Sequence, residues 1–246
     1  MIFLFISRQI KMLVRSYLRE TIDGIIYKNI DCESETINVI NMFFGDFTED
    51  VPINKFIISR FGVTTRSLHW EMQLRESIQD GVSIIAIDEK TNNLVGFQIN
   101  TIIDLKRISE TEIEESIYDD EKQFDLFRII NHICTDMADV NHLLLKKIPS
   151  LQRIFDSYAI GVSRVFRHKS IAINLLKYSL KIARNVETQC ATIFAANPVT
   201  EKLACKFNYR KIKSKSWNTF EVDGKKIFAD YQNGSENCNN FYLDFN

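Results

Sequence analysis

Short apolar and β-branched runs alternate along the chain with longer segments in which apolar residues recur every three or four positions. The short runs predict strands, at Gly24–Ile30, Phe155–Ser163 and Cys190–Ala196. The longer segments predict helices, at about 34–44, 54–61, 65–78, 121–147, 167–185 and 198–207. Gly45 and Pro52 are expected to end the first of these helices. Strands that alternate with helices in this way indicate an α+β layered domain.

Two hairpins are predicted in addition. They join the following pairs of runs: Val82–Asp88 with Asn93–Asn100, and Trp217–Val222 with Lys225–Tyr231. The dipeptide Asp223-Gly224 between the second pair is a strong turn signal. Residues 104–120 are charged and acidic, so a surface loop with a short helix is expected there.

The composition is that of an ordinary soluble protein, and it excludes several classes. The 246 residues are 45% hydrophobic and 26% charged, which suits one large domain with a sizeable core. The formal net charge of -1 gives no bulk attraction for nucleic acid, so any anion site must be local. The five cysteines are odd in number and lack a C-x-x-C spacing, which argues against a disulfide framework and favours a reducing, cytoplasmic compartment.

The N-terminal segment begins with apolar residues, but Arg8 and Lys11 interrupt it before it could span a membrane or form a signal peptide. No later stretch reaches transmembrane length. We therefore expect residues 1–20 to be an extension and residues 21–246 to form the domain, as a monomer without membrane association.

Candidate chemistry concentrates at the turn between the strand that ends at Ser163 and the helix that follows it. A helix that begins directly after a strand directs its first unpaired N–H groups and the positive end of its dipole into the turn. The turn also carries side-chain donors and small residues: Arg167, His168, Lys169, Ser170 and Ala172. Together these features predict a pyrophosphate-binding site.

The same turn resembles a motif of a known superfamily. Arg167-x-x-Ser170-x-Ala172 is similar to the Arg/Gln-x-x-Gly-x-Gly/Ala signature with which GNAT acyltransferases hold the pyrophosphate of acetyl-CoA. Upstream, Phe43-Phe44 and then Asp50-Val51-Pro52-Ile53-Asn54 resemble the Phe-Phe…Asp-Glu-Pro-Leu-Asn block of insect-type arylalkylamine N-acetyltransferases. The resemblance extends over about Ile25–Tyr231 and rests on the order and spacing of these motifs.

The resemblance implies a mixed central β-sheet flanked by helices and splayed between two neighbouring strands to admit acyl-CoA. It implies acetyl-CoA as the co-substrate and a small amine as the acceptor, in a pocket walled by residues 43–54 and 121–147. Ile160 and Val162 would bind the cofactor, and the Val162 N–H would also face the oxyanion. The turn would supply the remaining cofactor contacts, from Arg167, His168, Lys169, Ser170, Ile171 and Ala172.

Several positions depart from the family pattern. Ser170 replaces the middle glycine, and Val51 stands where the arylalkylamine branch has the glutamate that acts as general base. Ala196 and Ala204 occupy a hydroxyl position and the general-acid tyrosine position, whereas Thr200 keeps the second hydroxyl. These losses leave two alternatives open: a non-catalytic acyl-CoA-binding relative, and an acyltransferase for another amine such as a polyamine or a protein amine.

Acyl transfer needs a base to deprotonate the amine, and the acids nearest to Val51 are Glu49 and Asp50. Either could act through a water, and Asp50 could equally decorate a solvent loop. Thr200 could protonate or bind the leaving thiolate, or be an ordinary first-turn threonine. Asn197 is expected to cap the helix that follows it, and contact with the pantetheine arm of CoA is a further possibility for the same residue.

Two other clusters were candidates for different chemistry. His132, Asp136 and Asp139 share one face of a predicted helix at a spacing that suits a divalent metal. Arg128, one turn earlier, favours an ion-paired surface instead, and we predict no metal site. The basic stretch Arg210–Lys215 could bind a phosphate of CoA or RNA, and a strand edge protected by lysines is the preferred interpretation.

Overall fold

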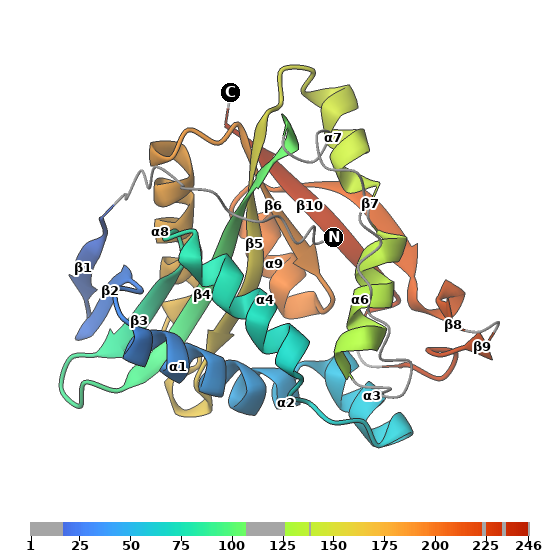
Figure 1. The fold of residues 1–246 in the computed structure, drawn as a ribbon, viewed down its shortest axis with the longest axis horizontal. Coiled ribbons are helices and arrows are strands. Elements are labelled where there is room, and N and C mark those ends of the chain that lie inside the picture. The colour runs from blue at the N-terminus through green and yellow to red at the C-terminus, as the bar shows by residue number, and fades with distance from the viewer. Residues whose placement is uncertain (1–16, 107–125, 138, 223–224, 233–234, 246) are drawn as a thin grey trace.

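The computed structural model describes residues 17–106, 126–137, 139–222, 225–232 and 235–245. They form an eight-stranded mixed sheet with helices on both faces (Figure 1), as expected. In chain order its strands are β1 (Arg19–Ile22), β2 (Ile25–Asn29), β3 (Ile84–Asp88), β4 (Leu94–Asp104), β5 (Arg153–Val162), β6 (Cys190–Ala195), β7 (Arg210–Ser216) and β10 (Asn237–Asp244). Their order in space is β1-β2-β3-β4-β5-β6-β10-β7.

The sheet opens between β5 and β6. All neighbouring strands are antiparallel except these two, which run parallel because helix α8 (Ile171–Asn185) crosses over between them. The pairing of β5 with β6 ends at Ser157 and Ile193. Beyond this pair β5 continues to Val162 and β6 to Ala195, so the two strands diverge. This divergence is the predicted splay.

Two layers of helices cover the two faces of the sheet. The first layer shares one apolar cluster and consists of α1 (Glu33–Met42), α3 (Pro52–Phe61), α4 (Leu68–Gln79) and α6 (Leu126–Asp136). The second layer, α8 and α9 (Pro198–Lys206), builds a separate cluster. In α8 the buried Leu175, Leu176 and Ala183 recur at helical spacing, which gives the helix one apolar face toward the sheet.

Two predicted helices differ from the structure. The segment 121–147 was expected as one helix, but its described part forms α6 and a separate α7 (Val140–Lys147) with Asp139 as N-cap. Helix α8 begins at Ile171 and not at Arg167, because His168 and Ser170 have left-handed backbones with φ of 64° and 61°. These conformations belong to a turn and not to the first turn of a helix.

The helix expected to end at Gly45 instead continues. It passes through a π-helical turn, η1 (Phe43–Phe47), into the short α2 (Thr48–Asp50). The Thr48 hydroxyl donates to Phe43 O at 2.6 Å, which satisfies a carbonyl in the wider turn. Pro52 then begins α3 at a position where its missing N–H is tolerated.

Both predicted hairpins are confirmed, the second as the short pair β8 (Glu221–Val222) and β9 (Lys225–Lys226). β10 was not predicted, and β1 extends the sheet into the segment assigned to the N-terminal extension. Residues 107–120 of the predicted acidic loop lie outside the described residues. The five cysteines are free. In the ranges given above, no helix combines the length and apolarity needed to cross a membrane.

Candidate active site

A β-bulge marks the point where β5 leaves β6. The register against β4 shifts between Ile99 and Asn100, which leaves Tyr158 as an extra residue on β5. The Tyr158 hydroxyl accepts a hydrogen bond from Trp70 Nε1 at 2.7 Å and donates one to Gln73 Oε1 at 3.1 Å. Burial raises the pKa of Tyr158, so the phenol stays protonated.

The backbone of β5 presents donors to the opening. Ser163 N–H donates to Val95 O on β4 at 2.9 Å. Because N–H groups alternate between the two edges of a strand, those of Val162 and Ile160 point the other way, toward β6. Arg167 Nε donates to Val162 O on that side at 3.2 Å. Both residues predicted to bind the cofactor thus adjoin the opening, and their cofactor contacts remain predictions.

The predicted pyrophosphate turn lies directly after β5 and faces solvent. Following the 3-10 turn η2 (Arg164–Phe166), its four polar residues are exposed: Arg167, His168, Lys169 and Ser170. Ser170 is the N-cap of α8 and has the left-handed backbone that glycine adopts most easily, so a glycine would fit this position without strain. Ile171 is 2% exposed and Ala172 is half-buried, so Ile171 can offer a ligand only its backbone.

Asp50 pairs with two arginines at this turn. Arg164 Nε and Nη2 donate to its carboxylate at 2.8 and 2.9 Å, and Arg167 Nη2 pairs with Asp50 Oδ2. The hydrogen bonds from Arg164 and Arg167 hold the pKa of Asp50 well below its usual range. A carboxylate this weakly basic is a poor proton acceptor at neutral pH, so the geometry argues against Asp50 as the base. The side chain of Glu49 is 60% exposed and lies 3.8 Å from Arg164.

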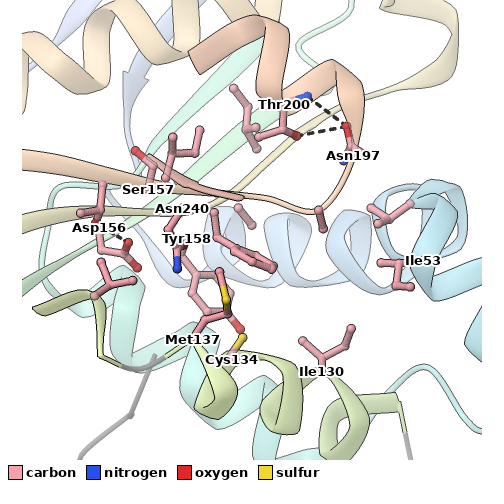
Figure 2. A pocket seen from close by; sticks show the side chains of 18 of the residues that line it. Ile53, Ile130, Cys134, Met137, Asp156, Ser157, Tyr158, Asn197, Thr200 and Asn240 are labelled. Carbon is pink, nitrogen blue, oxygen red and sulfur yellow. Dashed lines mark hydrogen bonds between the residues drawn. The ribbon is translucent and has the colours of Figure 1, made fainter. Parts of the chain in front are cut away.

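Asn197 caps α9, as predicted. Its Oδ1 accepts hydrogen bonds from the N–H groups of Val199 and Thr200, both at 3.0 Å, with Pro198 at the first helical position. Thr200 Oγ1 donates to the same oxygen at 3.3 Å (Figure 2). The cap occupies Asn197 Oδ1, so its amide nitrogen is the polar atom that remains for a ligand. Contact of either residue with CoA stays a prediction.

A pocket of about 190 Å³ lies beside the bulge, among β5, β6, α6 and the segment that contains η1. Its walls are mostly apolar and include Phe43, Phe47, Val51, Ile53, Trp70, Ile130 and Met137. Its polar lining includes Asn141, Asp156, Ser157, Thr192 and Asn240. Figure 2 shows Asp156 at one end and Ile53 at the other. Both segments expected to wall the amine pocket contribute to this lining. Glu49 and Asp50 do not.

Asp156 is a candidate functional residue that was not predicted from the sequence. It is 9% exposed, and Thr192 Oγ1 donates to its Oδ1 at 2.7 Å. Burial raises the pKa of Asp156, and the hydrogen bond from Thr192 opposes that shift. Among the described residues that line the pocket, Asp156 alone carries a formal charge. The one signal in the sequence was an acidic residue inside a strand whose neighbours are mostly apolar.

Three positions that depart from the expected catalytic pattern differ in their surroundings. Val51 and Ala196 line the pocket, so a carboxylate or a hydroxyl at either position would face it. Ala204 lies on the buried face of α9 and is not part of the lining. The lining of the pocket is therefore apolar at both Val51 and Ala196.

The predicted metal-ligand cluster and the basic stretch Arg210–Lys215 each contribute a residue to an ion pair. Asp139 pairs with Lys213 of β7, and Lys211 Nζ lies 3.4 Å from Glu201. β7 is the last strand of the sheet, which confirms the lysine-bearing edge. The side chains of His132 and Asp136 lie outside the described part of the structure. Among the side chains that are described, no three potential ligands gather around a metal-sized site.

Comparison with solved structures establishes the fold. Arylalkylamine N-acetyltransferase 2 from Aedes aegypti matches with a TM-score of 0.75 at 20% identity, over 91% of this chain and 100% of that one. An agmatine N-acetyltransferase matches with a TM-score of 0.72 at 14% identity, over 91% and 100% of the two chains. A Drosophila melanogaster polyamine N-acetyltransferase gives 0.72 at 12% identity, over 90% and 100%. No protein-family model and no curated protein sequence matches. The GNAT fold expected from the sequence is confirmed.

Proposed function

We propose that this GNAT-fold protein is an acetyl-CoA-dependent N-acetyltransferase whose acceptor is a small amine with one positive charge and an apolar body. The observation that carries the proposal is Asp156, which alone brings a formal charge to the described lining of the pocket. A carboxylate in apolar surroundings favours a cationic partner, and an amine is a cation before it reacts. The apolar walls suit the remainder of such a molecule.

Acetyl-CoA is the proposed donor because the groups that it needs adjoin one another. The exposed turn offers Arg167, Lys169 and the first N–H groups of α8, which suit a diphosphate. The outward N–H groups of Ile160 and Val162 suit the pantetheine arm and the developing oxyanion. Thr200 lines the pocket at the open end of the two strands, where it would meet the departing thiolate. Solved structures with a similar fold include an arylalkylamine N-acetyltransferase and an agmatine N-acetyltransferase.

The pocket favours a monoamine over a diamine. Agmatine and polyamines carry a second cation, which would lie away from Asp156 among side chains such as Ile53 and Ile130 (Figure 2). A charge that is desolvated without a partner is strongly unfavourable. An arylalkylamine or alkylamine places hydrocarbon at that end instead, and we therefore propose acceptors of this class.

The test is thiol release from acetyl-CoA with matched acceptors: a phenylalkylamine, an n-alkylamine and the α,ω-diamine of the same chain length. We expect kcat/KM for the alkylamine to exceed that for the diamine by about tenfold or more, the equivalent of about 1.4 kcal/mol. Preference for the diamine would contradict the proposed acceptor class. Binding of acetyl-CoA without turnover of any amine would support the non-catalytic alternative that Val51 and Ala196 suggest.

A further inference from the structure

Asp156 lies where a proton acceptor is needed, and neither acid predicted from the sequence does. We infer that the Asp156 carboxylate is the general base that deprotonates the acceptor amine, an inference that rests on the proposed acyl transfer. It would take the part of the glutamate that Val51 replaces. The base has then moved from the loop that walls the pocket to the central strand beside the sheet opening.

The placement of Asp156 follows from the strand register. Asp156 pairs with Thr192, and the next pair, Ser157 with Ile193, is the last before β5 and β6 diverge. Two residues along a strand span about 7 Å, so Asp156 lies about that far from the bulged Tyr158. Both side chains line the same pocket. An amine nitrogen placed at the opening is thus within reach of the carboxylate, directly or through one water.

The competing acids lack this placement. Asp50 is engaged by Arg164 and Arg167 outside the pocket, and its hydrogen bonds stabilise the ionised form. The side chain of Glu49 is 60% exposed and also lies outside the lining. Asp156 is therefore the one carboxylate that the described structure presents to a molecule in the pocket.

The reaction balances with Asp156 in this role. The substrate ammonium gives one proton to the Asp156 carboxylate and becomes a neutral amine. Its lone pair forms the C–N bond at the thioester carbonyl carbon, and the C–S bond breaks with its electron pair leaving on sulfur. The nitrogen then loses a second proton, which ends on the CoA thiolate, and Asp156 returns its own proton to solvent. The products are the acetamide, CoA thiol and one released proton.

The titratable groups around Asp156 stay neutral in the working range of the enzyme. These groups are two thiols and two phenols: Cys190 on β6, Cys134 on α6, Tyr158 on β5 and Tyr209, which directly precedes β7. Burial raises the pKa of each of these thiols and phenols, to about 12 for Cys190. The neighbouring groups from α7 and β10 in the lining are uncharged amides. Among the described residues that line the pocket, Asp156 is therefore the group expected to ionise in that range.

Thr192 is a positioning residue for this base. Its hydroxyl donates to Asp156 Oδ1 at 2.7 Å, which fixes the carboxylate and favours its charged form. Thr192→Val removes the donor and retains the shape, so the pKa of Asp156 should rise further. Thr192→Ser keeps the donor and is the matched control.

The first experiment compares wild type, Asp156→Asn and the remote control Asp230→Asn at saturating acetyl-CoA. The acceptors are an alkylamine and its β,β-difluoro analogue, whose nitrogen is largely unprotonated at the assay pH. Asparagine keeps an oxygen for the Thr192 hydroxyl, and thermal melting verifies the fold. We expect kcat of Asp156→Asn at saturating amine to fall about 100-fold or more with the alkylamine but less than about tenfold with the fluorinated amine, which needs no base. Loss of cation binding alone would instead raise KM for the alkylamine and leave kcat unchanged, which would also overturn the inference.

Several results of this experiment would overturn the assignment of Asp156 as the base. Equal losses with both acceptors would assign Asp156 to orientation or folding and overturn the inference, as would an undiminished rate. Absence of turnover by the wild type removes the proposed function together with the inference, whereas full turnover by Asp156→Asn removes only the inference.

The second experiment is the pH dependence of kcat/KM for the two Thr192 variants. A carboxylate base must be ionised, so activity rises with pH through the pKa of Asp156. We expect this rise to move to higher pH in Thr192→Val and to stay in place in Thr192→Ser. A rise that does not move in the valine variant means that another group is the base.

Discussion

Replacing Asp50 by asparagine separates the two roles open to this residue. Asparagine keeps the shape of the side chain but loses the charge that holds Arg164 and Arg167. If Asp50 only restrains the arginines, kcat should stay within a few-fold of wild type. Acetyl-CoA should bind more tightly, because Arg167 no longer has to leave a carboxylate to meet the diphosphate.

The magnitude follows from the exposure of the partners. The side chains of Arg164 and Arg167 are 53% and 40% exposed, against 15% for Asp50. Ion pairs of this kind contribute little to stability, because solvent screens them. Losing both should lower the melting temperature by about 2–4 °C at most. Releasing Arg167 alone should lower the Kd for acetyl-CoA by about two- to fivefold.

Calorimetric titration of acetyl-CoA and a thiol-release assay measure the two effects. The gain in affinity should shrink as ionic strength rises, since exposed charges are screened. The stability difference should also depend on pH. The depressed pKa of Asp50 means that its contribution is present above the ordinary aspartate pKa of about 3.9 and is lost as the pH falls through the folded-state pKa. A loss of kcat of about 100-fold at an unchanged Kd would make Asp50 the base and refute this reasoning.

Four further outcomes are expected. Arg167→Glu should abolish the rise in melting temperature that acetyl-CoA gives the wild type by mass action, and a retained rise would remove Arg167 from the donor site. Asn197→Ala should lower the free energy of unfolding in urea by about 1 kcal/mol because two N–H groups lose their cap, whereas Asn197→Asp should leave it unchanged. Ser170→Gly should raise the same quantity by about 0.5 kcal/mol, since the left-handed backbone disfavours serine by more than glycine loses in chain entropy. Asp156→Asn should raise the melting temperature at neutral pH, because the raised pKa of Asp156 in the folded state means that burial disfavours its charged form. This gain in melting temperature should vanish below the ordinary aspartate pKa of about 3.9. Equal melting temperatures of variant and wild type at neutral pH would contradict the burial of a charge.

The sequence predicted the parts of the site that depend on local order. A strand, a turn and a helix in succession predicted the exposed turn at Arg167, and the family resemblance implied the opening between β5 and β6. The start of α8 was predicted too early because histidine and serine, the residue types at positions 168 and 170, do not indicate a left-handed backbone. Glycine at either position would have indicated one. At Gly45 a helix end was predicted that the structure does not have, because the packing of Phe43 and Phe44 keeps that segment helical.

Asp156 could not be found in this way, because its environment is assembled from distant segments. Its hydroxyl partner, Thr192, is 36 positions away, and the amide of Asn240 in the same lining comes from β10, a strand that was not predicted. A single acid within a strand is compatible with an exposed edge as well as with a pocket. Only the sheet order, which places β5 in the interior between β4 and β6, distinguishes the two.

The charges at the sides of the sheet bear on self-association. The outermost described strands are β1 and β7, and they expose Arg19 and Glu20 on one side and Arg210 and Lys211 on the other. Unpaired backbone groups on an edge strand can pair with a strand from another molecule, and charged side chains oppose that pairing. Crowded or heated solutions of this protein should accordingly resist fibril growth through added strands until a reagent neutralises the lysines of β7.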